Sequence, residues 1–259
     1  MTISGLSSGS LVIAGGGRLP EDVIKKFIEL AGGPDRSIVV IPTAQEQVDM
    51  TKKGHDVIAF EEAGASNITI LHTTDRDLAN TADFAAPIQS AHAVWFSGGR
   101  QWRIADAYLH TEVHRELNAL LERGGVIGGT SAGATIQGSY LVRGDTKNNT
   151  ILMGDHEEGF GFLNNVAIDQ HLIKRNRQFD LVKVIAARPD LLGIGIDEST
   201  AIIVQGDSFE VVGASYVSIY DANYLNEHEG NFYFLSPGDT FNLTTREAKL
   251  SYNIQAASV

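Results

Sequence analysis

The sequence predicts an α/β fold, a three-layer sandwich with a mostly parallel central sheet. Its first half alternates short apolar runs with longer amphipathic stretches, which is typical of repeated βα units. The run Ile-Val-Val-Ile at 38–41 is continuous, as expected for a strand buried on both faces. Of the 259 residues, 43% are hydrophobic and 20% are charged, so the chain has the composition of a globular protein with a full core.

The apolar runs place the expected elements of the first half in order. Strands are predicted at 10–14, 37–41, 67–71, 93–96 and 126–129. A helix is predicted at 21–30, introduced by Pro20, which suits a first helical position. A second helix is predicted over 105–123, because the helical pattern there stops at a pair of glycines.

After about residue 193 the pattern changes to short strands joined by tight turns. Strands are expected at 201–204, 209–212 and 216–220. Such spacing is typical of antiparallel hairpins, which we expect at an edge of the central sheet. The sequence contains no internal repeat or interdomain linker, so residues 1–259 are predicted to form a single domain.

Composition excludes several classes of function. The chain has no cysteine, which rules out disulfides, thiolate metal sites and thiol nucleophiles. Its net charge of -12 argues against nucleic-acid binding and is more compatible with a cationic or zwitterionic substrate. The apolar run at 11–14 is too short for a signal peptide, and no run has the length of a membrane span. We therefore expect a cytoplasmic protein that does not contact membranes.

Ser131 is the candidate nucleophile. The segment Gly129-Thr130-Ser131-Ala132-Gly133 matches G-x-S-x-G and directly follows a predicted strand. Small neighbours permit a tight turn between strand and helix, which projects the serine above the sheet beside free amides of the helix. The Ala132 N–H is one natural donor to a tetrahedral oxyanion. A serine in a glycine-rich turn is also a common helix cap, so the motif needs a second element.

That element is the turn Ser97-Gly98-Gly99-Arg100-Gln101, which also follows a predicted strand. Because the ends of parallel strands converge at one edge of a sheet, the two turns are expected to lie together. Gly99 is therefore a candidate for the second oxyanion donor, and Gln101 for a substrate contact. On pattern alone, an ordinary turn between strand and helix is an equal alternative.

The general base must be one of eight histidines, and His171 differs from the rest. It follows the run Val166-Ala-Ile-Asp169-Gln170 and so lies at a strand end among polar side chains. A carboxylate is needed to orient its imidazole, and Asp197 and Glu198 follow another strand. Either acid could serve by pattern.

Residue order excludes one other class, and motif context excludes a second. The order serine, histidine, acid differs from the serine, acid, histidine order of α/β-hydrolases, so the motif does not indicate a lipase or esterase. The glycines at 15–17 lack the context of a phosphate-binding loop and predict a tight turn near the edge of the site.

The chain resembles the cyanophycinase and aspartyl dipeptidase family of serine peptidases, peptidase family S51, whose fold is related to class I glutamine amidotransferases. The resemblance spans most of the chain and rests on five ordered segments, 97–101, 128–134, 169–171, 175–177 and 193–198. It implies that Ser131 is the nucleophile, His171 the general base and Glu198 the orienting acid. It implies that Gly99 and Ala132 supply the oxyanion amides, and that the substrate pocket is lined by Gln101, Asp169, Gln170, Arg175 and Arg177.

The Asp-Gln-His form of 169–171 is similar to cyanophycinases rather than to aspartyl dipeptidases. The implied reaction releases β-Asp-Arg dipeptides from cyanophycin, a polyaspartate that carries arginine on its side chains. It proceeds through an acyl-enzyme with no metal or cofactor, in an enzyme expected to be a homodimer. We expect Arg175 and Arg177 to bind substrate carboxylates, and Asp169 or other acids to face the substrate guanidinium.

One departure from the family pattern concerns the substrate. Cyanophycinases usually continue Arg-x-Arg-x-x-Arg, whereas this chain has Asp180 at the position of the third arginine. The reversed charge keeps an alternative open, an aspartyl or isoaspartyl dipeptidase that does not act on the polymer. A second alternative is a non-catalytic binding protein on an amidotransferase-like scaffold.

Overall fold

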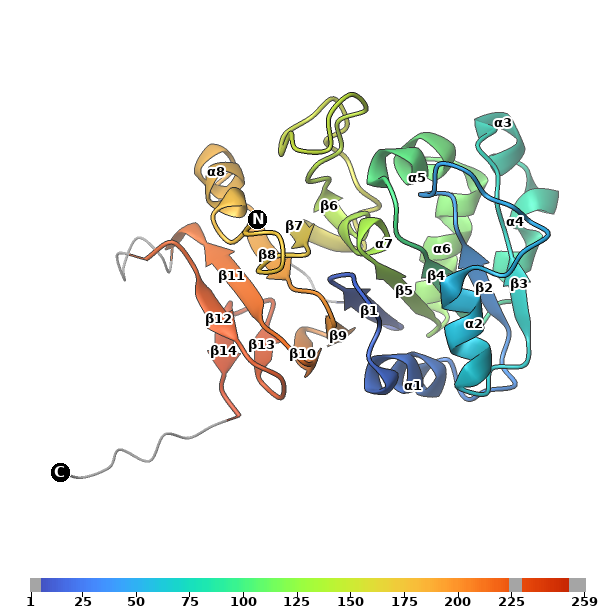
Figure 1. Ribbon diagram of the computed structural model, residues 1–259, viewed down its shortest axis with the longest axis horizontal. Helices are drawn as coiled ribbons and strands as arrows, with labels where there is room; N and C mark the ends of the chain where they lie inside the picture. Colours follow the sequence, from blue (N-terminus) through green and yellow to red (C-terminus); the bar gives the residue numbers. More distant parts are fainter. Residues whose placement is uncertain (1–5, 224–229, 252–259) are drawn as a thin grey trace.

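A computed structural model of the protein describes residues 6–223 and 230–251, and these form two sheets with helices on both sides (Figure 1). The strands of the described residues are β1 Ser10–Ala14, β2 Ile38–Ile41, β3 Ile68–Ile70, β4 Ala93–Phe96, β5 Val126–Thr130, β6 Gly138–Tyr140, β7 Leu163–Gln170, β8 Leu192–Ile196, β9 Thr200–Gln205, β10 Ser208–Gly213, β11 Val217–Asp221, β12 Tyr233–Leu235, β13 Thr240–Asn242 and β14 Glu247–Lys249. The helices are α1 Glu21–Leu30, α2 His55–Glu62, α3 Arg76–Ala79, α4 Ala82–Gln89, α5 Gln101–Tyr108, α6 Glu112–Glu122, α7 Ala132–Thr135 and α8 Asp180–Ala187.

The larger sheet has the order β14-β13-β10-β9-β1-β5-β4-β2-β3 within the described ranges. Its strands β1, β5, β4, β2 and β3 run parallel to one another, while β9, β10, β13 and β14 pair antiparallel. The predicted α/β class and the antiparallel additions in the C-terminal part are therefore confirmed. The register aligns Ala14 with Thr130 and Phe96 with Gly129, so β1, β5 and β4 end side by side.

The smaller sheet has the order β12-β11-β8-β7-β6 in the part of the chain that is described. Strands β6, β7 and β8 are parallel, and β11 and β12 add to them in antiparallel fashion. We expected the strand near 216–220 at the edge of the central sheet, and this was wrong. Strand β11 pairs with β8 of the smaller sheet instead. Next to this pairing, the Ser215 hydroxyl donates to Asp197 Oδ2 at 2.7 Å, which joins the start of β11 to the end of β8.

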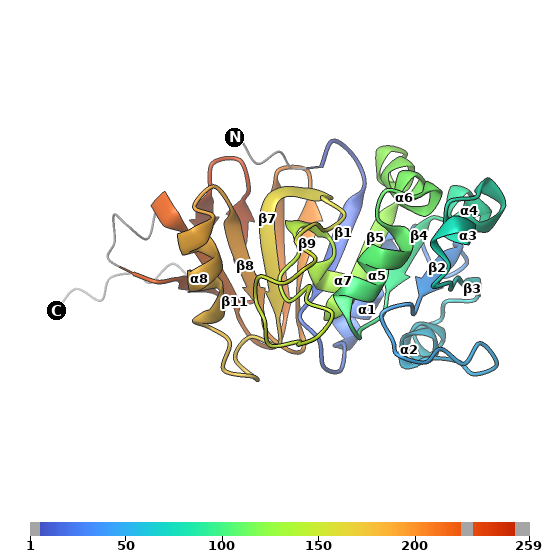
Figure 2. The ribbon, with the colours of Figure 1, turned by 90° about the horizontal axis from the view of Figure 1, so that it is seen from above.

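The core follows the two-residue period of the strands. In β1, Val12 and Ala14 pack with the apolar faces of α1 and α2, while Leu11 and Ile13 face the opposite side with residues of α4, α5 and α6. Figure 2 shows α1 and α2 on one side of the parallel strands and α4 and α6 on the other. The buried cluster that contains Leu11 and Ile13 continues into β7, β8 and β11, so the two sheets share one hydrophobic core.

The prediction of one helix over 105–123 was wrong, because α5 and α6 are separate helices. His110 has a left-handed backbone with φ 60°, which interrupts the helical hydrogen bonds. The break is fixed by Tyr108, whose hydroxyl is 2.7 Å from Thr43 Oγ1 and whose carbonyl accepts from Thr111 Oγ1 at 2.7 Å. The contact with Thr43 joins Tyr108 to a loop far away in the sequence, which local helical periodicity does not report.

Candidate active site

Ser131 lies in the turn that joins β5 to α7, and its backbone is strained. Its φ of 55° and ψ of -108° are rare for a residue with a side chain, and such strain concentrates at functional sites. A Cβ on Gly129 would lie 2.3 Å from the Gly133 carbonyl oxygen, and one on Gly133 would lie 2.2 Å from that of Phe96. The glycines of G-x-S-x-G are therefore required for α7 to pack against β5 and β4.

Three side chains from different strand ends form a hydrogen-bonded chain. Ser131 Oγ lies 2.8 Å from His171 Nε2, and His171 Nδ1 lies 2.7 Å from Glu198 Oε1. The serine follows β5, the histidine follows β7 and the glutamate lies two residues after β8. Because a carboxylate only accepts hydrogen bonds, Nδ1 carries the proton and Nε2 accepts from the serine hydroxyl. This is the arrangement of a nucleophile, a base and an orienting acid.

The glycine turn after β1 packs directly against two of these residues. The Gly15 carbonyl accepts from the His171 N–H at 2.8 Å. A Cβ on Gly16 would lie 2.3 Å from the imidazole ring, and one on Gly17 would lie 2.9 Å from Glu198 Oε2. We expected this turn near the edge of the site, and it instead forms the surface on which the histidine and the glutamate rest.

The surroundings of His171 keep its imidazole neutral. Burial lowers the pKa of His171, the charge of Arg175 lowers it further, and the hydrogen bond from Glu198 opposes both effects. The net shift is downward from the ordinary value of 6.5. A neutral imidazole at neutral pH can accept the serine proton, which is what a general base requires.

The N–H groups of two residues near the serine, Gly99 and Ala132, have no acceptor within the described residues. Ala132 opens α7 beside the serine, and the turn after β4 brings Gly98 so close that a Cβ there would lie 3.4 Å from Ser131 Cβ. Among the described residues, no backbone or side-chain oxygen accepts from the N–H of Gly99 or of Ala132. Both amides are therefore available to a ligand.

The two adjacent acids after β8 have different partners. Asp197 accepts from the backbone N–H of Ile173 at 2.9 Å and of Lys174 at 3.0 Å, and so secures the turn after His171. Glu198 faces the imidazole instead. The pattern alone left both acids open, and the geometry assigns the contact with His171 to Glu198.

The side chains of two residues expected in the substrate pocket, Gln101 and Asp169, point into the protein interior. Gln101 is 1% exposed, and its Nε2 donates to the Val142 carbonyl at 2.7 Å. Asp169 is fully buried, and Arg143 donates to its two oxygens from Nε at 2.9 Å and Nη2 at 3.0 Å. The expectation that Asp169 faces a substrate guanidinium is wrong for this reason, since an internal guanidinium already occupies the carboxylate.

Arg143 was not found from the sequence. It is 3% exposed and also bonds Asp180, with Nη2 2.5 Å from Oδ2. The acid at the position of the third family arginine thus pairs with an internal arginine. A single arginine in a loop carries no sequence signal, because only its partners distinguish it from a surface residue.

The remaining pocket residues lie beside the histidine. Gln170 Oε1 accepts from Arg177 Nη1 at 2.8 Å, and the same nitrogen donates to the Gln170 carbonyl at 3.0 Å. Arg175 is exposed, and its N–H donates to the His171 carbonyl at 3.0 Å. The two arginines therefore follow the base in a single turn and place two positive charges on its side of the nucleophile.

Comparison with known proteins identifies the family. Residues 6–212 match peptidase family S51. The chain is 30% identical over 246 residues to a cyanophycinase of Geminocystis herdmanii, which covers 88% of this chain and 90% of that protein. It is 32% identical over 246 residues to a cyanophycinase of Trichormus variabilis, and the alignment covers 87% of this chain and 81% of that protein. A crystal structure of a peptidase from an acI-B1 Actinobacterium superposes with a TM-score of 0.70 at 26% identity, covering 92% of this chain and 98% of that one.

The fold and the family match together define a serine peptidase, and therefore a hydrolase. The chain belongs to peptidase family S51. Among the helices of residues 6–223 and 230–251, none combines the length and the apolar composition needed to cross a membrane.

Proposed function

We propose that the protein is an exopeptidase that hydrolyses cyanophycin to β-Asp-Arg dipeptides through Ser131, His171 and Glu198. The observation that carries the proposal is the unbroken chain of hydrogen bonds of 2.8 and 2.7 Å through these three side chains. The names of the curated relatives, cyanophycinases that align over most of the chain, support the substrate.

The proposed reaction has two stages. His171 Nε2 takes the proton of Ser131 as the serine oxygen bonds to a backbone aspartyl carbonyl carbon, and the amides of Gly99 and Ala132 hold the oxyanion. The imidazolium then gives its proton to the leaving amine, so that the peptide bond breaks and an acyl-enzyme ester remains. A water molecule, deprotonated by the same imidazole, hydrolyses the ester and frees the serine.

The same side of the site supplies the charge for substrate carboxylates. We propose that Arg175 and Arg177 bind them, with Gln170 holding Arg177 in place through the hydrogen bond of 2.8 Å. Asp180 forms its ion pair with Arg143, whereas Arg177 feels the charge of Asp180 and lies 3.9 Å from Asp169 Oδ1. Gln101 and Asp169 support the pocket from behind rather than touching the substrate.

The test replaces the nucleophile. Ser131→Ala is expected to lower release of β-Asp-Arg from purified cyanophycin by at least about 10³-fold, because the covalent route is lost. Ser90→Ala, an exposed serine after α4, is the matched control and is expected to retain full activity. Release of the dipeptide by Ser131→Ala at the rate of the control would reject the assignment.

The dipeptidase alternative remains because of Asp180, which removes one cation from the family pattern. Comparing cyanophycin with free α- and β-aspartyl dipeptides separates the two activities, since a dipeptidase hydrolyses only the latter. Labelling of Ser131 by a serine-directed phosphonate argues against a non-catalytic binding protein. The single domain over 1–259, the cytoplasmic location and the homodimer stay predictions.

A further inference from the structure

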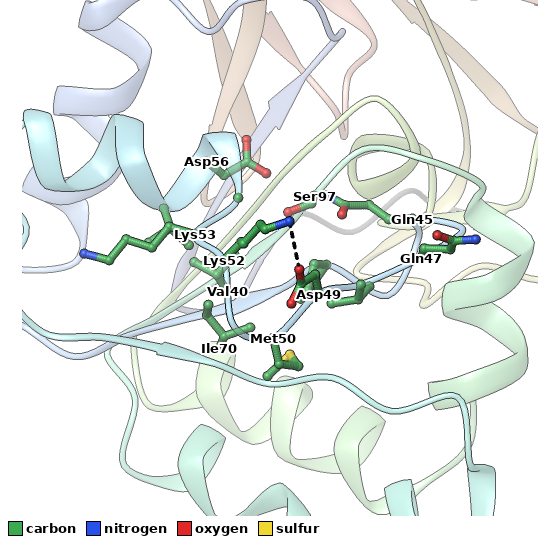
Figure 3. Close-up of a pocket in the computed structure, with 14 residues that line it drawn as sticks. Val40, Gln45, Gln47, Asp49, Met50, Lys52, Lys53, Asp56, Ile70 and Ser97 are labelled. Atoms are coloured by element: carbon green, nitrogen blue, oxygen red, sulfur yellow. Dashed lines mark ion pairs between the residues drawn. The ribbon is translucent and has the colours of Figure 1, made fainter.

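A cavity of about 180 Å³ lies at the carboxyl ends of β2, β3 and β4. It is bounded by the start of α2, the loop after β2 and the end of β4, and Ser97 forms part of its wall (Figure 3). Ser97 opens the turn whose Gly98 lies against Ser131. In the order β1-β5-β4, the turn that supports His171 and the turn at Ser97 flank the nucleophile on opposite sides.

The cavity has one polar and one apolar side. Figure 3 shows Asp56, Ser97 and Gln45 along one side and Val40, Ile70 and Met50 toward the other, with the ion pair of Lys52 and Asp49 between them. A ligand that fits both sides has an aliphatic stem and a polar head. An arginine side chain has this composition, with three methylene groups that end in a planar cation.

Asp56 is the acid in this cavity that lacks a cationic partner. The other charged side chains of the lining are engaged, since Lys52 pairs with Asp49 at 3.2 Å and Lys53 pairs with Glu61 at 2.7 Å. Within the described residues, no lysine or arginine forms an ion pair with Asp56. Burial raises the pKa of Asp56, and the adjacent Ser97 hydroxyl and the charge of His55 oppose this only in part. A cation in the cavity would compensate the carboxylate.

Capping of α2 does not account for Asp56. An acid in the first turn of a helix can cap the free N–H groups or stabilise the helix dipole. The N-cap of α2 is Gly54, and no side chain caps this helix. The Asp56 carboxylate lies next to Trp95 of β4 and next to Ser97, which directly follows that strand.

Asp56 also lines a second hollow. A groove of about 870 Å³ between α1 and α2 is lined by Asp56 at one end and by Gly17 and Ser199 at the other. Gly17 lies against Glu198 and Ser199 follows it in the chain, so the groove reaches the neighbours of Glu198. The cavity is one residue away from the nucleophile's own contact, because Ser97 lines the cavity and Gly98 lies against Ser131.

We propose that Asp56, together with Ser97, binds the guanidinium of the arginine that the attacked aspartyl residue carries on its side chain. This inference rests on the proposed function, since it names the part of that substrate which the cavity holds. The site then has two charged sides. Arg175 and Arg177 bind carboxylates next to His171, and Asp56 binds the cation on the opposite side of the nucleophile.

The experiment compares (β-Asp-Arg)₂ with its counterpart in which citrulline, a neutral isostere, replaces arginine. The wild-type protein is expected to prefer arginine by about tenfold or more in kcat/KM, as for a charge-assisted hydrogen bond. Asp56→Asn is expected to abolish this preference by raising KM for the arginine substrate about ten- to a hundredfold, with citrulline hydrolysis unchanged within about twofold. The matched control, Asp77→Asn on α3, alters an exposed aspartate and is expected to keep the preference.

Thermal unfolding of Asp56→Asn checks that the variant is folded, and Ser97→Ala is a second variant that leaves α2 intact. Ser97→Ala is expected to weaken the preference for arginine in the same direction. Retention of the full preference in Asp56→Asn, or an equal loss for both substrates, would overturn the inference.

A separate binding measurement distinguishes failure of this inference from failure of the proposed function. Calorimetric binding of β-Asp-Arg to the wild-type protein and to Asp56→Asn does not need turnover. Weaker binding to the variant without any hydrolysis by the wild type would reject the reaction and keep the cation site. Equal binding to both proteins would reject the cation site whatever the activity.

Discussion

Gly16→Ala is a sharp test of the site geometry, because the added methyl group would collide with the base. It would lie 2.3 Å from His171 Cε1 and 2.7 Å from Nε2, whereas real Cβ atoms essentially never approach within 3.0 Å of another heavy atom. The imidazole or the glycine turn must therefore move by at least about 0.7 Å. The 2.8 Å contact between His171 and Ser131 cannot absorb such a movement and remain a good hydrogen bond.

The expected effect is on the chemical step. A displacement of the base near 1 Å costs about 10²-fold in rate, which corresponds to about 2.7 kcal/mol of barrier. We expect kcat for β-Asp-Arg release to fall by about that factor, with KM within about threefold of the wild type, because the arginines of the pocket are not displaced.

The matched control is Gly33→Ala. Gly33 has φ +115° and Gly16 has φ +111°, so both substitutions impose similar backbone strain, but a Cβ on Gly33 meets no atom within 4 Å. Gly33→Ala is therefore expected to lose stability and to retain activity. Equal kcat values for the two folded variants, measured below their unfolding temperatures, would refute the role given to the glycine turn.

Three further predictions follow from the contacts. Glu198→Gln is expected to lower kcat by about 10³- to 10⁴-fold with little change in KM, because the amide no longer selects the imidazole tautomer; an unchanged kcat contradicts the triad. The value of kcat/KM is expected to rise with pH, with its midpoint below 6.5, since burial and Arg175 lower the pKa of His171. Arg175→Gln removes a charge that disfavours the imidazolium, so the midpoint is expected to move to higher pH. A shift of the midpoint to lower pH would contradict the effect assigned to Arg175. In urea unfolding, Arg143→Met is expected to lower the free energy of unfolding by about 3–5 kcal/mol, because it leaves the buried Asp169 carboxylate unpaired. Arg188→Met breaks a half-exposed ion pair and is expected to lower it by less than about 1 kcal/mol. Similar losses in both variants would contradict the importance given to burial.

The fold was readable from the sequence where local rules decide the structure. Continuous apolar runs gave the parallel strands, and small residues around Ser131 gave the turn that exposes it. Prediction failed where distant contacts decide. Tyr108, the last residue of α5, contacts Thr43, and Ser215, just before β11, contacts Asp197 after β8. Neither contact leaves a periodic pattern in the sequence.

The site divides in the same way. The positions of Ser131 and of His171 at strand ends were expected from the pattern alone, while the choice of Glu198 needed the family resemblance. The sequence did not reveal that Gln101 and Asp169 point inward, since exposure depends on which side chains cover a residue. Arg143 and Asp56 were missed because each is defined by a partner, present or absent, from another part of the chain.

The sequence by itself therefore determined the α/β class, the strained serine turn and the residues able to act as base and acid. These features depend on side-chain size and on the two-residue period of strands, which are local properties of the chain. Only the tertiary structure decided that Asp169 is held by Arg143, that Gly16 supports the imidazole and that Asp56 lines a cavity together with Ser97. Each of these depends on the order of strands in the sheets, which brings together segments 26 or more residues apart.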